Sequence, residues 1–427
     1  MRRVEFSVFI MFLFAAGAAQ GQSADSRGDE QYQAVRQQET ATNFPLGLYD
    51  SLSEIGMELQ LGVTNVYQQN VHGGLSTHRR AGRFSGSYDL ELSADMEKLA
   101  GIENGSVYVL TEGVWSKSAG IDEPAVGSFF GVNGDARDRR AMDVTELWYE
   151  HAFLGGACRI RLGKMDLTGG FEHHNCPVAF DCSNFANDET TQFLNNALIN
   201  NPTIPFPDYG LGVGVHYGPD EVWYVSAAVA DAQADIRETG FGTAFHEEDY
   251  LFCIFETGIT PQLRSINGPL QGAYRLGMWY DPQDKERFSD GRARRDDTGF
   301  YLTFDQMLCK ENNDPEDGQG FAAFGRYGWA SSKVNEVTNF FSAGFQYQGL
   351  LPERDLDVLA LGFARGVFSD EAATFTDNYE SVWELYYSAR LSGSLAVSPS
   401  IQYVHNPGAD GAAADALVMG ARLQMNF

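Results

Sequence analysis

The sequence is poor in basic residues. Among its 427 residues, Lys and Arg number 30 whereas Asp and Glu number 58, which gives a formal net charge of −28 at pH 7. Binding to nucleic-acid phosphates requires Lys and Arg gathered in clusters, and such clusters are missing here. The composition therefore argues against nucleic acid as a partner.

Long hydrophobic runs and catalytic motifs are also scarce. Beyond the N-terminal segment there is no run of about 18 apolar residues, so we expect no transmembrane helix in the mature chain. A membrane-spanning β-strand needs only about 10 residues and is not excluded. The sequence contains no G-x-S-x-G element, and its eight His form no positioned pair apart from His173 and His174. We therefore expect no enzyme activity.

Cysteine occurs only five times. Cys176 and Cys182 lie close together in the chain and could close a small disulfide in an oxidising compartment. Metal ligation by these two thiols with His173 and His174 is the alternative, but the spacing matches no zinc template well. The sequence therefore offers Cys176 and Cys182 as a candidate disulfide and predicts no metal site.

The N-terminus has the form of a secretory signal. Arg2 and Arg3 precede an apolar stretch from Phe6 to Ala16, and small residues follow up to Ala19. A membrane anchor is the alternative, but the apolar stretch is shorter than the roughly 20 residues that span a bilayer. We predict a signal peptide over residues 1–19 and a flexible polar lead-in over 20–51, ahead of one folded domain over 52–427.

Glycine and aromatic residues are abundant: the chain has 46 Gly and is 13% aromatic, against only 14 Pro. This composition is typical of strands and turns. Apolar and polar side chains alternate with a period of two, the period of a strand with one apolar face, in many segments. In the clearest segment, at the C-terminal end, Leu417, Met419, Ala421, Leu423, Met425 and Phe427 alternate with Gly420, Arg422, Gln424 and Asn426.

The alternating segments predict sixteen strands joined mostly by long and short connections in turn. An even number of strands connected in this way is typical of an antiparallel up-and-down β-barrel that spans an outer membrane. The predicted class is therefore all-β, a transmembrane barrel of about 16 strands. The strands are expected near 54–66, 82–95, 104–114, 141–152, 157–165, 209–217, 221–230, 250–259, 271–280, 298–307, 320–330, 337–347, 355–365, 380–391, 395–404 and 415–427.

Tryptophan falls mostly within the predicted strands. In a membrane barrel, aromatic side chains form girdles at the two interfaces, whereas in a soluble sandwich they would belong to the core. We interpret them as girdle residues, because the chain ends inside a strand that can close against the first strand. The residues concerned are Trp148, Trp223, Trp279, Trp329 and Trp383.

The longest predicted connection runs from about 167 to 208. Connections of this length are usually functional or disordered. We expect this one to fold into the barrel and narrow it. Phe185, Phe193 and Phe206 would then supply stacking surfaces for a ligand, or would pack the connection against the wall.

Several segments together resemble the carbohydrate-selective porins of the OprB type. They are LGKMD at 162–166, GLLPERDLDVLALGFARG at 349–366, YESVWELYY at 379–387, PSIQYVHNPG at 399–408 and GARLQMNF at 420–427. The resemblance covers about Leu52 to Phe427. It implies a sixteen-stranded barrel in the outer membrane of a Gram-negative-type bacterium that passes sugars down their gradient without a cofactor. It also implies recognition of the last strand by the barrel assembly machinery through Phe427.

A sugar filter needs polar side chains on the inner face of the barrel. Carboxylate and guanidinium groups hydrogen-bond to neighbouring hydroxyls of a sugar in pairs. Lys164 belongs to the family-like GKxD element, but it shares its parity with Leu162, so it is expected at the rim. The alternative is that the inward-pointing polar residues line the lumen without giving the channel any specificity for sugars. The strand parity predicts that Arg159, Arg161, Glu58, Asp305, Glu384, Arg390 and Arg422 point inward.

These observations favour a passive outer-membrane porin for mono- or oligosaccharides, surrounded by outer-membrane lipid. A nonspecific general diffusion porin is one alternative. The other is a secreted soluble β-protein that binds or degrades glycans. The sequence leaves open whether the chain forms a homo-oligomer, because an oligomer face of a barrel resembles a lipid face.

Overall fold

The computed structural model describes residues 48–116, 120–137, 140–168, 179–220, 222–234, 250–314 and 317–427. These residues belong to one compact unit. The predicted signal peptide over 1–19, most of the predicted lead-in and Cys176 lie outside the described residues. Residues 48–51, which we expected in the lead-in, begin helix α2 (Leu48–Glu54) instead.

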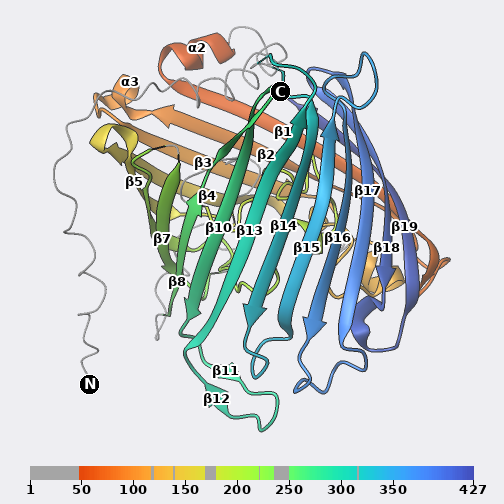
Figure 1. Ribbon diagram of the computed structural model, residues 1–427. Coiled ribbons are helices and arrows are strands. Elements are labelled where there is room, and N and C mark those ends of the chain that lie inside the picture. The colour runs from red at the N-terminus through yellow and green to blue at the C-terminus, as the bar shows by residue number, and fades with distance from the viewer. Residues whose placement is uncertain are drawn as a thin grey trace, which may run out of the picture. The chain divides into compact units, whose positions relative to one another are not determined.

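Sixteen strands of the described chain form a closed antiparallel barrel (Figure 1). Each strand pairs with the next, and the last pairs with the first, with Val63 opposite Met425. The all-β barrel of about sixteen strands is thus confirmed. The strands are β1 (Met57–Gly74), β2 (Gly82–Asp95), β3 (Gly105–Val114), β4 (Arg140–Phe153), β5 (Cys158–Lys164), β6 (Leu211–Tyr217), β7 (Trp223–Asp231), β8 (Leu251–Ile259), β10 (Gly268–Asp281), β13 (Asp297–Lys310), β14 (Gly320–Ala330), β15 (Val337–Gln348), β16 (Val358–Phe368), β17 (Tyr379–Ser392), β18 (Leu395–His405) and β19 (Ala414–Asn426).

Each predicted strand corresponds to one of these, and the largest shift is in β1. We predicted that this strand begins at residue 54 and ends at 66, but Glu54 closes α2 and the strand continues to Gly74. Residues 67–74 carry polar side chains on both faces, so the alternation stops while the pairing with β2 and β19 goes on. Shorter elements lie in the connections, namely α3 (Met96–Ala100), α4 (Asn196–Ile199), β9 (Gln262–Ser265), β11 (Lys285–Glu286) and β12 (Ala293–Arg294). None of the helices in the described part of the chain combines the length and apolar composition needed to cross a membrane.

Burial alternates along the strands as the sequence pattern predicts. On β17, Trp383 is 47% exposed on the outer face, whereas its neighbour Glu384 is 1% exposed. Trp223 and Trp329 also lie on the exposed face. The girdle interpretation is wrong for Trp148 and Trp279, which are buried, because their strand positions point inward. An alternation of period two fixes which residues share a face, and here it places these two rings inside.

The predicted segment near 104–114 has a weak alternation because apolar residues occupy its inward positions, where Tyr108, Leu110 and Val114 are buried. Its pairing with β4 is also irregular, and the extra residues lie on β4. The pairing of β3 with β4 shifts between Leu110 and Thr111 and again between Glu112 and Val114. Such β-bulges bend a strand and change which residues face inward. Across the first shift both Thr145 and Glu146 of β4 are buried, although they are adjacent.

Two long connections fold against the inner face of the barrel. We name them loop L2 (residues 115–139) and loop L3 (residues 165–210), and all that is said of their structure concerns the described residues 115–116, 120–137, 165–168 and 179–210. L3 hydrogen-bonds to side chains of β8, β13, β14, β17 and β19, which lie around the closed sheet. One loop can reach all these strands only from inside the barrel.

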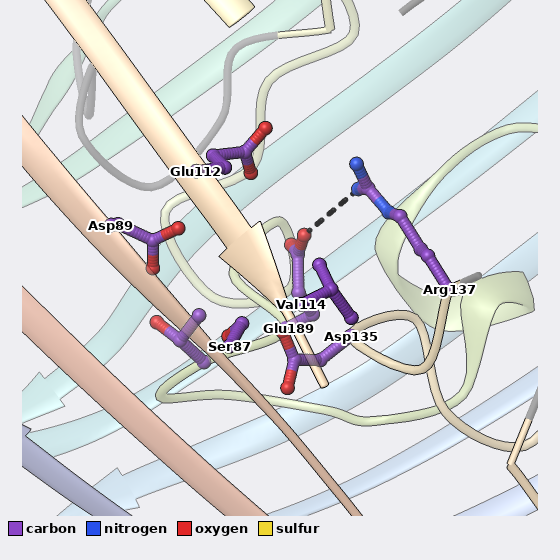
Figure 2. A pocket seen from close by; sticks show the side chains of 8 residues that line it. Ser87, Asp89, Glu112, Val114, Asp135, Arg137 and Glu189 are labelled. Carbon is purple, nitrogen blue, oxygen red and sulfur yellow. Dashed lines mark hydrogen bonds and ion pairs between the residues drawn. The ribbon is translucent and has the colours of Figure 1, made fainter. Parts of the chain in front are cut away.

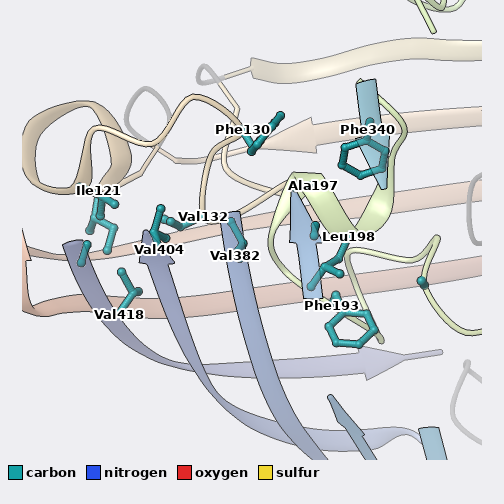
Figure 3. Packing of buried hydrophobic residues seen from close by; sticks show 14 of the residues in the cluster. Ile121, Phe130, Val132, Phe193, Ala197, Leu198, Phe340, Val382, Val404 and Val418 are labelled. Atoms are coloured by element: carbon teal, nitrogen blue, oxygen red, sulfur yellow. The ribbon is translucent and has the colours of Figure 1, made fainter. Parts of the chain in front are cut away.

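The two loops meet the wall in an apolar core (Figure 3). L3 contributes Phe193 and Leu198, and L2 contributes Phe130 and Val132. The rings of Phe193 and Tyr386 on β17 pack edge to face, with centroids 5.1 Å apart. The predicted role of Phe193 as a ring that packs the loop to the wall therefore fits its position. A second apolar cluster, which includes Met165 and Phe180 of L3 and Trp148 and Trp279 of the wall, packs another part of the same loop against the barrel.

Candidate functional site

The tip of L3 is held by two of the predicted inward-facing residues, Glu384 and Arg422. The Glu384 carboxylate accepts hydrogen bonds from the backbone N–H groups of Leu194 and Asn195, both at 2.9 Å. The Arg422 guanidinium on β19 donates to the carbonyl oxygens of Glu189 at 2.9 Å and Gln192 at 2.8 Å. Both side chains are buried beneath the loop. They point inward as their parity predicts, but their polar atoms face the loop backbone.

The opposite side of L3 is held in the same way. Asp305 on β13 accepts from the Ser183 hydroxyl at 2.6 Å and forms an ion pair of 2.9 Å with Arg275 on β10. Arg326 on β14 donates to the carbonyl oxygens of Leu198 and Ile199 at 2.7 and 2.9 Å. Asp305 is therefore also a residue that positions the loop.

L2 is anchored by Glu380 on β17. Its carboxylate accepts from the Ser128 hydroxyl at 2.6 Å and from the N–H groups of Phe129 and Gly408 at 2.8 and 2.6 Å. Charged acceptors form the stronger class of hydrogen bond, so a single buried carboxylate here fixes one turn of the loop. Nothing in the sequence marked L2 as an inward loop, because its length alone does not distinguish it from an exposed one.

L2 and L3 touch each other at a junction inside the barrel. The Gly134 N–H donates to the Leu194 carbonyl at 2.8 Å, and the Asn196 side chain donates to the Phe130 carbonyl at 2.8 Å. At the same junction Arg137 of L2 and Glu189 of L3 form an ion pair of 3.4 Å. Their side chains remain 34% and 21% exposed, so water reaches both charges.

The predicted site residues of β5 form a second charged group. The Arg161 guanidinium pairs with Glu150 at 2.9 Å and stacks over the Trp148 ring, 3.7 Å from its centroid. Arg159 lies 3.4 Å from the same carboxylate and is 37% exposed. Lys164 is buried and donates to the Val144 carbonyl at 2.9 Å.

Lys164 departs from the strand alternation because of the glycine before it. Gly163 has φ of 139°, a conformation that favours glycine, and a Cβ there would lie 2.3 Å from the Leu147 carbonyl oxygen. Leu162 before it is exposed on the outer face. The backbone thus changes direction at Gly163, and Lys164 lies against the backbone of β4 instead of at an exposed rim.

The other predicted residues lie apart from the loop junction. Glu58 is half-buried near the start of β1, opposite Ser93, and Arg390 is half-buried near the end of β17, where it donates to the Gly393 carbonyl at 3.2 Å. Phe427 exchanges two backbone hydrogen bonds with Leu61, of 2.9 and 3.2 Å, next to the pairing of β1 with β19. The pairing of Cys182 with Cys176 stays a prediction, since Cys176 is outside the described residues.

An acidic hollow lies beside the junction, between β2, β3 and the two loops (Figure 2). Asp89 and Glu112 project from the strands, Asp135 and Arg137 from L2, and Glu189 from L3. Burial is the main reason that the pKa values of Asp135 and Glu189 are raised, each to about 7. The charge of the hollow therefore changes near neutral pH.

Sequence reasoning missed this hollow. Asp89 alternates with Tyr88 and Leu90, so its parity could have placed it inside the barrel. Glu112 shares its parity with Leu110 and Val114, whose apolar side chains are also buried, so the sequence does not mark this face of β3 as polar. The loop residues Asp135 and Glu189 have no periodic signal. Within the described ranges, no group of three or more His, Cys, Asp or Glu side chains is arranged to hold a metal ion.

A closed antiparallel barrel with an apolar outer face, and with loops folded into a charged interior, defines the class of outer-membrane porins. The sequence comparison is more specific. The family model described as "Carbohydrate-selective porin, OprB family" matches residues 79–427, and the chain belongs to this family. It is thus an outer-membrane porin for sugars in Gram-negative bacteria, and family membership implies a channel rather than an enzyme. The alternative of a secreted soluble β-protein is set aside.

Individual relatives agree with this assignment. Porin B of Pseudomonas aeruginosa is 22% identical over 417 residues, covering 89% of this chain and 90% of the relative. The high-pH structure of Pseudomonas putida OprB superimposes with a TM-score of 0.76 at 19% identity, covering 89% of this chain and 96% of that one. The low-pH structure of the same protein gives a TM-score of 0.57 at 15% identity, covering 91% and 98%. At these identities, the two structures establish the shared fold.

Proposed function

We propose that L2 and L3 form the selective constriction of the sugar channel, and that Arg137 and Glu189 contact the passing sugar. The ion pair between the loops is the observation that carries this proposal, because both charged groups keep access to water inside the barrel. A guanidinium presents several donors in one plane and a carboxylate presents acceptors, a combination that fits neighbouring hydroxyls of a sugar. The channel is then selective rather than a general diffusion pore.

The predicted pore-lining residues take two different roles in this proposal. Asp305, Glu384 and Arg422 are positioning residues, because they are buried and each hydrogen-bonds to the backbone of L3, Asp305 through the Asn184 N–H. Arg159 keeps an exposed side chain and serves as a second contact for the sugar, closer to the Leu154–Gly156 turn. The width of the channel at the constriction then depends on how firmly the positioning residues hold L3.

The outer face and the chain ends complete the proposal. The apolar residues that alternate on the outer face contact outer-membrane lipid, and Phe427 forms the signal for the barrel assembly machinery. Residues 1–19 direct export, and a disulfide between Cys176 and Cys182 stiffens L3. The same outer face can also support a homo-oligomer. These assignments follow from the strand pattern and from the family resemblance.

Replacing Arg137 with Gln is expected to weaken sugar binding about tenfold while the channel still conducts ions, since a charged hydrogen bond to a hydroxyl is lost. The measurement is the block of single-channel current by glucose and maltose in a planar bilayer. Arg292→Gln is the matched control, because Arg292 is 82% exposed and lies in the connection between β11 and β12. If no sugar blocks the wild-type channel, the protein is a general diffusion porin. If Arg137→Gln leaves the block unchanged, this residue does not contact the sugar.

We expect the channel to prefer cations, because the chain has a formal net charge of −28, and we expect this preference to fall as the pH falls. The raised pKa values of Asp135 and Glu189, each about 7, mean that these carboxyls gain protons and lose their negative charge as the pH drops through neutrality. The groups that face them are Asp89, Glu112 and Arg137. The reversal potential in a KCl gradient, measured from about pH 8 to about pH 5.5, reports this change. A reversal potential that does not vary over this range, or that varies equally in Asp135→Asn, would contradict the expectation.

A further inference from the structure

A cationic side chain interrupts the apolar outer face of strand β16. Arg365 has the parity of Leu361, which is 40% exposed, and not that of the buried Ala360 and Ala364. Its partner on the neighbouring strand β15 is Phe341, which is also exposed. Side chains that share a parity on a strand share a face of the sheet. A guanidinium therefore lies among the residues that face lipid.

This guanidinium has no acidic partner in the described part of the chain. Nε of Arg365 is enclosed without an acceptor, and Cζ lies 3.8 Å from the centroid of the Tyr379 ring. The neighbouring carboxylates bind other groups. Asp415 accepts from the Tyr403 hydroxyl at 2.6 Å, and Glu380 faces the interior, where it holds L2. Among the described residues, the charge of Arg365 is thus left without a counter-ion.

The ring in contact with Arg365 is held by a hydrogen-bonded row on the same face. The Tyr379 hydroxyl lies 3.1 Å from Nε2 of His405, and Nδ1 of His405 lies 2.8 Å from the carboxylate of Asp415. When Nδ1 donates to Asp415, Nε2 is left as the acceptor for the Tyr379 hydroxyl. A guanidinium over an aromatic ring uses its face in this contact and keeps the N–H donors at its edge available. The row therefore fixes the cation while its terminal donors stay open to a ligand.

The row lies at the extracellular rim of the barrel. Tyr379 is the first residue of β17 and His405 the last of β18, and Ser381 pairs with Arg365 on one side and with His405 on the other. β16 is the thirteenth strand around the barrel and runs in the same direction as β3 and β5, from whose ends L2 and L3 depart. Long connections mark the extracellular side of such barrels. Arg365 is therefore placed at the level of the lipid headgroups of the outer leaflet.

We propose that Arg365 binds the phosphate group of a lipid in the outer leaflet, on the outer wall of the barrel. A guanidinium presents its donors as a planar fork that fits two oxygens of a phosphate. Basic side chains near a membrane surface also attract anionic headgroups. The acyl chains of the same lipid lie along the apolar wall below, where the rings of Phe363 and Trp383 pack with centroids 4.6 Å apart. This site is separate from the path of the sugar and adds a lipid as a specific partner.

Native mass spectrometry of the protein extracted from outer membranes in detergent tests the proposal. The probes are phosphorylated lipid A, the same lipid A with its phosphates removed, and inorganic phosphate. The wild type is expected to bind the phosphorylated lipid about tenfold more tightly than the dephosphorylated one, as for one charged hydrogen-bonding contact. Arg365→Gln should remove this difference. Arg365→Lys, which keeps the charge but not the planar fork, should retain part of it.

The aromatic contact and a distant arginine supply the controls. Tyr379→Phe keeps the ring and should keep the preference for phosphorylated lipid, whereas Tyr379→Leu should reduce it. Arg264→Gln should behave as wild type, because Arg264 is exposed on β9, in the connection between the eighth and ninth barrel strands and thus at the opposite rim. The compact band on unheated denaturing gels shows that each variant is folded.

Several outcomes would overturn the proposal. Equal binding of the two lipids by the wild type is one, and a preference that is unchanged in Arg365→Gln is another. Displacement of the lipid by inorganic phosphate at the same concentration would indicate a site for free phosphate instead. A dimer or trimer mass that Arg365→Gln dissociates, with no effect of the lipid phosphates, would assign this residue to an interface between copies of the chain.

Discussion

Replacing Glu384 with alanine is expected to raise the single-channel conductance and to weaken the block by sugars. The substitution removes the acceptor for the N–H groups of Leu194 and Asn195, and each unpaired buried donor costs about 1–3 kcal/mol. The tip of L3 can recover this free energy only by moving to water, away from the wall. Bilayer recordings with glucose measure both effects.

Two further variants show whether the effect comes from the loop anchor. Glu384→Gln keeps an oxygen acceptor and is expected to give an intermediate conductance, whereas Glu103→Ala removes an exposed carboxylate and should behave as wild type. Arg422→Met removes the donors to Glu189 and Gln192 and should act in the same direction as Glu384→Ala. Wild-type conductance and sugar block in Glu384→Ala would show that L3 stays in place without this anchor.

Replacing Arg326 with methionine is expected to cause the largest loss of stability, about 3–5 kcal/mol, because it leaves a buried charge uncompensated. The Arg326 side chain is fully buried, 3.5 Å from the carboxylate of Asp181, and it holds the carbonyl oxygens of Leu198 and Ile199. The temperature at which the compact band on denaturing gels converts to the extended band measures this loss. The exposed Arg292→Met is the control.

The pKa of Asp181 supplies a second check on the same pair. Burial raises the pKa of this carboxyl to about 6, and the nearby Arg326 acts in the opposite direction. Without Arg326 the Asp181 carboxyl is expected to hold its proton at higher pH. The difference in stability between Arg326→Met and the wild type should therefore be smallest in acid, where Asp181 is neutral in both. Asp181→Asn in the Arg326→Met background should restore part of the stability. If the double variant is as unstable as the sum of the two single variants, the pair is not coupled.

The strands could be predicted because the barrel has two different environments on its two faces. The outward positions are apolar along most of each strand, so the period of two appears directly in the sequence, as on β17 and β19. The same signal correctly placed Glu384 and Arg422 on the inner face. Alternation identifies a face but not a partner, and therefore it could not show that these charges bind L3 rather than a solute.

The parts that could not be predicted are those that depend on the irregular backbone. L2 enters the barrel because Glu380 and the apolar side chain of Phe130 hold it there, and neither residue is distinctive in the sequence. The bulge in β4 and the positive φ at Gly163 each change the parity of the next residue. The junction of Arg137 with Glu189 joins two loops, and loops carry no periodicity.

The pairing of β1 with β19 has a consequence for the order of events during folding. The Thr64 hydroxyl donates to Gln424 at 2.7 Å across 360 residues of sequence, and pairings between such distant segments form slowly. Arg422 on the same strand binds the carbonyl oxygens of L3. L3 therefore gains these two hydrogen bonds only after β19 has joined the sheet, so this part of the loop reaches its final position late in folding.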